Sequence, residues 1–274
     1  MKKFNVGLQL YGVRNAMAED FEGTLRAVRD MGYEYVEFTT FFDKTGEEVK
    51  ALLDELGLKC ISAHKGLDYY EGERAIEDLK AIGIKFSVIP WYDKTKLAGT
   101  EGWEESKKVF NELADRLAEN GIKLGYHNHE FEFATYQGKT LHDYIFEAVP
   151  ADKMDPEIDT CWVRYASLNP EDMIRKYKGR VEVVHLKDFV CKRFGGGPVY
   201  ELIGSDAKPA TREENGFEFR PLGDGIQDFA TILKACEECG TETVIVEQDK
   251  TYGGMTELEA AKRSRDYLKN TFGI

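Results

Sequence analysis

Short apolar runs alternate with amphipathic stretches along most of the chain. The runs are rich in Val, Ile and aromatic residues, and they begin near Phe4, Tyr33, Leu58, Ile84, Ile122, Met154, Val181 and Thr243. Between them, apolar residues recur every three to four positions, as in FEGTLRAVRDM, EEVKALLDELG and DFATILKACEECG. The first pattern is typical of buried strands and the second of helices that cover them. The sequence therefore predicts a strand followed by a helix, repeated eight times.

Residues that favour helix ends lie at the borders of these stretches. Thr45 and Glu48 have the spacing of a capping box, and Asn169 precedes Pro170 as an N-cap precedes a first-turn proline. Glycines follow where helices are expected to stop, at Gly32, Gly57, Gly83, Gly121 and Gly240. Strands and helices that alternate in this way form parallel sheets with right-handed crossovers.

The number of units and the chain length favour a closed barrel. Eight strand–helix units in 274 residues match the size of a (β/α)8 TIM barrel. An open doubly wound sheet is the alternative, but the first loop, LQLYGVRN, lacks the GxGxxG fingerprint of such folds. We therefore predict one (β/α)8 barrel domain over residues 1–274, closed by pairing between residues 4–10 and 243–247.

Charge and composition exclude several classes of partner. The net charge is −13 and the lysines and arginines are scattered, which argues against a nucleic-acid partner. No run approaches the roughly 18 apolar residues that cross a membrane. The five cysteines are odd in number and lie in or beside predicted core elements, so we expect a reduced, cytoplasmic protein. Cys236 and Cys239 have CxxC spacing but lie on one predicted helix without a second pair, which argues against a zinc motif.

Most histidines fall where a predicted strand gives way to a loop. These four are His64, His127, His129 and His185, whereas His142 lies on a predicted helix. Carboxylates end other strands at Glu37, Asp159 and Glu247. In a (β/α)8 barrel the active site lies at the C-terminal ends of the strands. We therefore expect these side chains to meet in one pocket although they are far apart in the sequence.

Three of these residues suit a metal site. Asp159, His185 and Glu247 end the predicted sixth, seventh and eighth strands, so they should adjoin. The alternative for Asp159 is a helix cap, and for His185 a bond to a backbone carbonyl. One histidine with two carboxylates suits a divalent ion such as Mn²⁺, Co²⁺, Mg²⁺ or Zn²⁺, with open positions for substrate oxygens. We predict one such ion, held by these residues and a fourth ligand.

The segment HNHEFEF offers several candidates for the fourth ligand. Period-two alternation places His127 and His129 on one side of the strand and Asn128 on the other. We predict that the deeper His127 is the metal ligand, and that His129, nearer the mouth, is an acid/base group or a substrate contact. Glu130 or Glu132 replaces either histidine if the strand ends early.

Further side chains at the strand ends are expected to contact substrate. The predicted contacts are Trp91, Trp162, His64 and Glu37. Aromatic rings pack against the apolar face of sugars, although core packing is the alternative for each tryptophan. Lys187 is either a catalytic group or part of an ion pair outside the pocket. The long connection between Asp188 and Gly225 contains FGGGP and GDG and is typical of a lid or binding loop, with a functionless loop as the alternative.

Seven motifs run in order through nearly the whole chain. They are GLQLYGVR, GYEYVEF, LGYHNHEFEF, EIDTCWV, VVHLKD, FRPLGDG and VIVEQD. Together they resemble the sugar phosphate isomerase/epimerase family of xylose-isomerase-like barrels, which hold one divalent metal through a Glu, an Asp, a His and a second Glu. The resemblance implies that Asp159, His185 and Glu247 are the last three ligands. His127 stands where many members have the first glutamate, which puts two-base epimerisation in doubt.

The resemblance implies a metal-dependent sugar or sugar-phosphate isomerase or epimerase. Such enzymes remove a proton next to a metal-bound carbonyl, with Glu247 as the expected base and His129 or Lys187 as the second proton-handling group. Members with His-x-His at this place are similar to inosose dehydratases and to enzymes acting on 3-keto sugars, so a lyase is the second hypothesis. A non-catalytic barrel that binds a sugar or polyol is the third. The expected partner is a small sugar or polyol, and homo-oligomerisation stays open.

Overall fold

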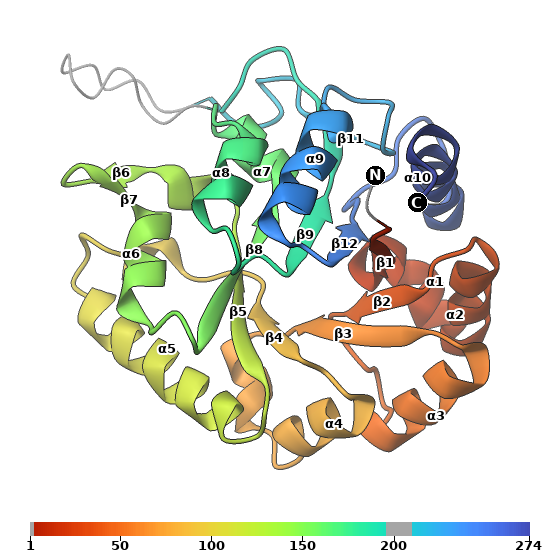
Figure 1. Cartoon of the computed structure of the whole chain (residues 1–274), viewed down its shortest axis with the longest axis horizontal. Coiled ribbons are helices and arrows are strands. Elements are labelled where there is room, and N and C mark those ends of the chain that lie inside the picture. The colour runs from red at the N-terminus through yellow and green to blue at the C-terminus, as the bar shows by residue number, and fades with distance from the viewer. Residues whose placement is uncertain (1–2, 196–209) are drawn as a thin grey trace.

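Eight parallel strands close into a barrel in the computed structural model, which describes residues 3–195 and 210–274 (Figure 1). Their order around the barrel is β1, β12, β9, β8, β5, β4, β3 and β2. Their bounds are β1 (Asn5–Gln9), β2 (Tyr35–Phe38), β3 (Lys59–His64), β4 (Phe86–Ile89), β5 (Lys123–His127), β8 (Met154–Asp159), β9 (Val183–Leu186) and β12 (Thr243–Val246). Each strand begins within two residues of its predicted start, and the predicted (β/α)8 fold is confirmed.

The first and last strands of the barrel close it. β1 pairs in parallel with β12, from Asn5 opposite Thr243 to Leu8 opposite Val246, so the predicted closure is confirmed. Gly7 allows a close approach at this seam, because a Cβ atom there would lie 2.4 Å from Cδ1 of Ile245. On its other side β1 pairs with β2, which places Gln9 opposite Glu37.

Helices surround the strands on the outside (Figure 1). They are α1 (Arg14–Glu19), α2 (Phe21–Asp30), α3 (Gly46–Leu56), α4 (Ala75–Ile82), α5 (Trp103–Ala118), α6 (Leu141–Ala148), α7 (Thr160–Tyr165), α8 (Pro170–Lys176), α9 (Phe229–Cys239) and α10 (Glu257–Phe272). Short 3-10 turns are η1 (Leu10–Val13), η2 (Leu67–Glu71), η3 (Lys94–Lys96) and η4 (Phe131–Phe133). Within residues 3–195 and 210–274, no helix has both the length and the apolar character needed to cross a bilayer.

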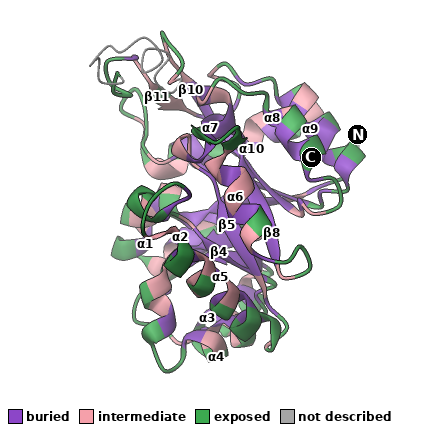
Figure 2. Ribbon diagram, turned by 90° about the vertical axis from the view of Figure 1, so that its left-hand side faces the viewer, coloured by how far each residue is buried: buried purple, intermediate pink, exposed green. Residues whose placement is uncertain are grey.

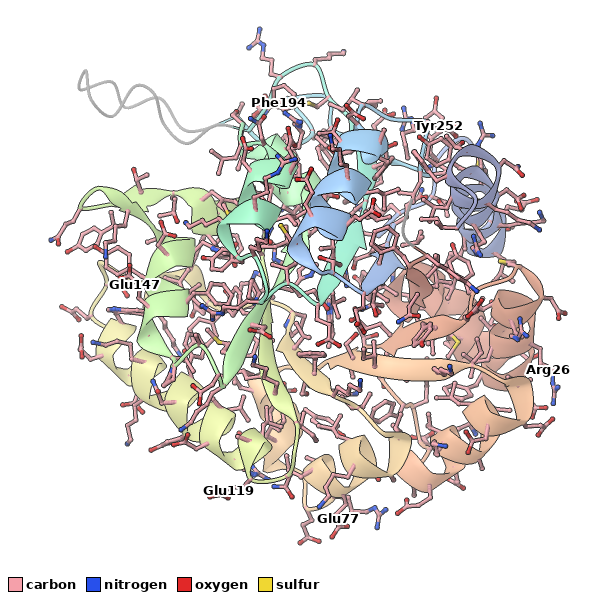
Figure 3. The ribbon with its side chains drawn as sticks, viewed as in Figure 1. Arg26, Glu77, Glu119, Glu147, Phe194 and Tyr252 are labelled. Atoms are coloured by element: carbon pink, nitrogen blue, oxygen red, sulfur yellow. The ribbon has the colours of Figure 1, made fainter. Side chains whose placement is uncertain are left out.

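The helices bury one face and expose the other. Figure 2 shows buried residues on the strands and exposed residues along the outer helices. Figure 3 shows charged side chains that project outward from this ring, among them Arg26, Glu77 and Glu147. The local signals at the helix ends also hold: Thr45 and Glu48 form the predicted capping box, and Pro170 lies at the start of α8. Amphipathic patterning together with these caps explains why the helices form here.

The inside of the barrel has two layers, since alternate residues of each strand point inward. Apolar side chains fill the N-terminal half, which we call the lower interior: Ile61, Phe86, Val88, Val183 and Ile245, with Tyr35 packed against them. Polar side chains fill the half nearer the C-terminal strand ends, which we call the upper interior: Gln9, Glu37, Ser62, His64, His127, Glu157, Asp159, His185, Lys187 and Glu247. A register shift between β2 and β3 brings both Ile61 and Ser62 inward.

A two-stranded ribbon extends the barrel beyond β9. β10 (Asp188–Val190) pairs antiparallel with β11 (Glu218–Arg220), within the segment predicted to be a lid or binding loop. The Asp188 carboxylate accepts backbone N–H bonds from Phe189, Gly223, Gly225 and Gln227. Residues 196–209 of this segment lie outside the described residues. A second small ribbon joins β6 (Thr135–Tyr136) to β7 (Lys139–Thr140).

Candidate metal and active site

A cavity of about 520 Å³ opens where the strands end. Its ionisable lining residues are Arg14, His64, His127, His129, Lys187, Glu247 and Asp249. Tyr11, Thr39, Phe42 and Trp91 are among the residues of the remaining wall. The lining comes from segments that are far apart in the sequence, and the barrel brings them together, as expected for this fold.

The four predicted metal ligands converge beside this cavity. His127, Asp159, His185 and Glu247 each offer one donor atom, and these atoms all lie within 4.8 Å of one another. They come from the ends of β5, β8, β9 and β12, which are neighbours in the barrel. His127 Nε2 lies 3.6 Å from Asp159 Oδ2, and His185 Nδ1 lies 3.0 Å from Glu247 Oε2. We call these four residues the upper group.

The two oxygens of Asp159 have different surroundings. Oδ1 accepts the backbone N–H groups of Cys161 at 2.8 Å and Trp162 at 3.1 Å, and so caps α7. Oδ2 is buried and has no hydrogen-bond partner. A buried carboxylate oxygen without a donor is costly unless a cation satisfies it. Asp159 therefore serves as the helix cap and still presents one oxygen to the upper group.

His127 and His129 face the same side, as the period-two pattern predicts. Both line the cavity, whereas Asn128 turns away and pairs with the backbone of Asp159, donating from Nδ2 at 3.3 Å and accepting at Oδ1 at 3.1 Å. His127 is the last residue of β5 and is buried; His129 lies two residues beyond it and is half-buried. This pairing between β5 and β8 fixes the depth of His127 relative to Asp159.

The alternative acidic ligands of this segment are occupied elsewhere. Glu130 pairs with Arg212, whose Nη2 lies 2.6 Å from Glu130 Oε2. Glu132 accepts the Tyr126 hydroxyl at 2.9 Å and the backbone N–H of His129 at 2.8 Å. Burial raises the pKa of Glu132 to about 8. Neither carboxylate belongs to the upper group.

Lys187 lies inside an acidic cluster rather than outside the pocket. Its Nζ is 2.7 Å from Asp249 Oδ1, 3.1 Å from Glu247 Oε2 and 3.4 Å from Asp159 Oδ2. Burial alone would lower the pKa of Lys187, but Asp249 and Glu247 hold it well above its usual range. Burial would likewise raise the pKa of Glu247, and Lys187 and His185 hold it well below its usual range. The site therefore contains an ammonium and a carboxylate in contact.

The two histidines of the HNH segment are neutral near pH 7. Burial lowers the pKa of His127 to about 4, even though Glu157 opposes this shift. Burial, together with the nearby His127 and Lys187, holds the pKa of His129 well below its usual range. A neutral imidazole is the form that ligates a metal or accepts a proton. His129 Nδ1 is buried and has no hydrogen-bond partner, although the ring lines the cavity.

Two of the four predicted substrate contacts line the cavity and two do not. Trp91 is 56% exposed at the cavity wall, and His64 also lines it. Glu37 is fully buried in the upper interior, where it accepts hydrogen bonds from Gln9 and Ser62. Trp162 is 1% exposed and stacks on Phe217 beneath the guanidinium of Arg212, since the β10–β11 ribbon covers it.

Sequence reasoning missed Glu157, which lies at the centre of the upper interior. Its Oε2 is 2.6 Å from His64 Nε2, 3.0 Å from His127 Nδ1 and 3.2 Å from His185 Nε2. With these three histidines it forms a second set of donor atoms within 4.8 Å of one another, which we call the lower group. The signal was present, because Glu157 precedes Asp159 by two residues and so shares its inward face.

Comparison with known sequences and structures identifies the family of this chain. Residues 25–271 match the profile of the xylose isomerase-like TIM barrel family. An inosose dehydratase of Geobacillus thermodenitrificans is 24% identical over 237 residues, which cover 85% of this chain and 72% of that protein. The structure of a sugar phosphate isomerase/epimerase from Parabacteroides distasonis has a TM-score of 0.78 at 20% identity and covers 99% of this chain and 96% of its own. A zinc-containing IOLI protein has a TM-score of 0.69 at 18% identity, with 98% and 100% covered. The chain therefore belongs to the xylose isomerase-like TIM barrel family.

Proposed function

We propose that this protein is a metal-dependent enzyme that removes a proton next to the carbonyl of a small keto sugar or keto polyol and then eliminates water. The observation that carries the proposal is the convergence of His127, Asp159, His185 and Glu247 beside an open cavity that also holds Lys187 and His129. Metal donors and proton-transfer groups at one cavity are the parts that such a reaction needs.

The upper group fits a divalent ion. It offers two imidazoles and two carboxylates, a donor set suited to Zn²⁺, Mn²⁺ or Co²⁺, and less to Mg²⁺, which prefers oxygen ligands. Asp159 Oδ2 is buried and accepts no hydrogen bond, although Lys187 Nζ lies 3.4 Å from it, and a bound cation would satisfy it directly. When bound here, the ion would polarise the substrate carbonyl and make the adjacent C–H more acidic.

The protein groups then handle the protons. Glu247 is the proposed base, because Lys187 and His185 keep it ionised despite its burial. Lys187, which stays charged beside Glu247 and Asp249, is the proposed donor to the departing hydroxyl. His129 lines the cavity as a neutral imidazole and is the proposed contact for a substrate hydroxyl or the alternative group for either proton transfer. Trp91, at the exposed wall, is the proposed surface for the apolar face of the ring.

The positions of these groups favour elimination over two-sided epimerisation. His129, Lys187 and Glu247 follow β5, β9 and β12, on one arc of the barrel. Across the cavity the wall contains Thr39, Phe42 and Trp91, and its imidazole, His64, is already bound through Nε2 to Glu157 at 2.6 Å and Glu37 at 3.1 Å. Epimerisation with one base on each face of the substrate needs such a group on both sides, whereas a syn elimination needs an acid and a base on one side only. The inosose dehydratase relative agrees with this outcome.

Isomerisation is the second candidate, because Lys187 and Glu247 lie 3.1 Å apart. A proton removed by one group can be returned to the neighbouring carbon by the other, on the same face. This outcome shares the first step and the metal with elimination. The isomerase or epimerase activity first expected from the sequence is therefore the second proposal. It would use the same metal and the same proton abstraction but would give a different product.

Incubation with inososes and keto sugars in D₂O tests the proposal. The protein is loaded with Mn²⁺, Co²⁺, Mg²⁺ or Zn²⁺ and the products are followed by NMR. Loss of water supports the dehydratase, and deuterium incorporation with the carbon skeleton intact supports isomerisation or epimerisation. The matched variant is Glu247→Gln, which keeps the shape of the side chain and removes both the proposed base and one charged metal donor, so metal content is measured beside turnover. Binding without exchange or product would leave a sugar- or polyol-binding barrel as the answer.

A further inference from the structure

Three histidine nitrogens converge on two carboxylates directly beneath the upper group. Glu157 Oε2 lies 2.6 Å from His64 Nε2 and 3.0 Å from His127 Nδ1. Glu37 Oε1 lies 2.8 Å from His185 Nε2 and 3.1 Å from His64 Nε2. Glu37 is fully buried and Glu157 is 2% exposed. These contacts take the place of water around both carboxylates. Glu37 and Glu157 are therefore part of the packed interior of the barrel.

The same histidines use their other nitrogen to face the upper group. His127 points Nδ1 at Glu157 and Nε2 towards Asp159, from which it is 3.6 Å distant. His185 points Nε2 at Glu37 and Nδ1 at Glu247, 3.0 Å away. Each ring therefore spans the two groups, with one nitrogen on a lower carboxylate and the other among the proposed metal donors.

A neutral imidazole carries one N–H and one lone pair, on different nitrogens. A carboxylate that accepts the N–H fixes which nitrogen is protonated and which way the ring faces. We propose that Glu157, assisted by Glu37, is a positioning residue that keeps the proton of His127 on Nδ1 and, once a metal occupies the upper group, the proton of His185 on Nε2. The lone pair of His127 Nε2 then faces Asp159, and that of His185 Nδ1 faces Glu247, where a metal would lie. The inference rests on the proposed metal site and adds the residues that prepare it.

The two lower carboxylates are themselves held in place. Gln9 Nε2 donates to Glu37 Oε1 at 2.5 Å, and the Ser62 hydroxyl donates to its other oxygen. Glu157 lies on β8 two residues before Asp159, so one rigid strand sets the spacing between the positioning carboxylate and a proposed ligand. His64 does not belong to the upper group, and its ring fills the space between Glu37 and Glu157.

A second ion in the lower group is the competing account, since its four donors are also close together. Simultaneous occupation of both groups requires metal on both nitrogens of His127 and of His185. Each ring would then lose its only N–H, which a neutral imidazole does not readily give up near pH 7. Carboxylates that accept those N–H groups avoid this cost: His127 Nδ1 hydrogen-bonds to Glu157 Oε2 at 3.0 Å, and His185 Nε2 lies 2.8 Å from Glu37 Oε1 in an ion-pair contact.

The test compares the Zn²⁺ affinity of full-length protein variants that carry substitutions on β8. The affinity is measured by competition with a chelator. Glu157→Gln and Glu157→Met should bind Zn²⁺ about 10–100-fold more weakly, the usual cost of losing a partner that orients a metal-bound histidine. The methionine variant should lie at the upper end, because the glutamine oxygen still accepts one N–H. The matched control is Asp155→Asn, which changes a carboxylate on the same strand that pairs with Lys123 and Arg180 and touches no histidine. Its affinity should be unchanged.

Nitrogen NMR of ¹⁵N-histidine protein reads the proton positions directly. In the Zn²⁺-loaded wild type, His127 should carry its proton on Nδ1 and His185 on Nε2. The opposite tautomers, or Zn²⁺ affinity in Glu157→Gln equal to that of the wild type, would overturn the inference. Two Zn²⁺ per wild-type chain, with one lost in Glu157→Gln, would overturn it in favour of a second ion. A wild type that binds no Zn²⁺, Mn²⁺ or Co²⁺ would instead reject the proposed function. If Glu157→Met does not fold, the Zn²⁺ affinity of Glu157→Gln and the histidine tautomers of the wild type still test the inference.

Discussion

The lower and upper interiors of the barrel occupy the same strands and have opposite chemistry. On β12, Ile245 packs in the lower interior and Glu247, two residues later, belongs to the upper group. On β9, Val183 and His185 show the same change. Burial of the apolar residues stabilises the fold, whereas burial of carboxylates and imidazoles costs free energy unless each finds a partner. One half of the barrel interior therefore stabilises the fold by apolar burial, and the other half holds the proposed metal donors and needs paired charges to stay folded.

Glu247→Gln should give the largest effect on activity and little loss of stability. Removing the proposed base should reduce turnover by about 10²–10⁴-fold. The thermal midpoint of the metal-free protein should fall only modestly, because the variant loses a carboxylate that pairs with Lys187 and His185, while Asp159 and Asp249 stay beside Lys187. Turnover and thermal unfolding of the same preparation check both. A large drop in the midpoint would break the contrast between the two interiors.

His127→Ala and His129→Ala should separate metal binding from proton transfer. His127→Ala should reduce metal content, because it removes one of the four donors of the upper group. His129→Ala should keep the metal and lose about 10²–10⁴-fold in rate if His129 moves a proton. Elemental analysis and turnover measured on both variants distinguish these roles. Loss of metal from His129→Ala alone would reverse the assignment, and no effect from either variant would return Glu130 or Glu132 to consideration.

Ile245→Ala tests the lower interior with a change on the same strand as Glu247. Removing a fully buried isoleucine side chain should cost about 2–5 kcal/mol of unfolding free energy, from lost burial and the cavity left behind. Turnover per folded molecule should stay close to that of the wild type. Denaturant unfolding gives the first quantity and an assay well below the unfolding midpoint gives the second. Equal losses in both would show that the two interiors are not separable.

His142 offers the smallest test, outside the barrel interior. It is buried on α6, where its Nδ1 shares a hydrogen bond of 3.1 Å with the Tyr177 hydroxyl, and burial lowers its pKa to about 3. The unfolded chain therefore binds this proton first, so stability is full above about pH 6.5 and is lost as the pH falls towards 3. His142→Phe should flatten this slope by up to about 1.4 kcal/mol per pH unit. The free energy of unfolding of the wild type and of His142→Phe, measured from pH 7 to pH 5, checks this prediction. An unchanged slope would contradict the lowered pKa of His142.

Periodicity and end signals were enough to predict the barrel. Strand starts, closure and the capping box follow from local patterns, and the eight strand–helix units left few other topologies. The side-by-side placement of Asp159, His185 and Glu247 follows too, because the order of strands in such a barrel is known once its fold is known. These features depend on repeated, short-range rules that each segment obeys by itself.

Depth inside the barrel was harder to predict than position along a strand. Glu157 was missed because the prediction considered only residues at the ends of strands. Glu157 points into the barrel two residues before the end of β8. Glu37 ends a strand in the sequence, but its place beneath His64 and His185 depends on the register of β1, β2 and β3. Trp162 is covered by the β10–β11 ribbon, whose pairing joins residues about 30 positions apart. Such contacts depend on several segments at once.

Asp188 has a consequence for how this protein can change. Its carboxylate binds the backbone of the returning chain at Gly223, Gly225 and Gln227, and a Cβ atom at Gly225 would come within 2.1 Å of it. The chain thus leaves at β10 and returns beside it at β11, fastened at the base. We expect these bonds to keep β9 and α9 in register when the loop beyond the ribbon changes in length. Arg212 and Phe217 limit such changes, because both pack on Trp162.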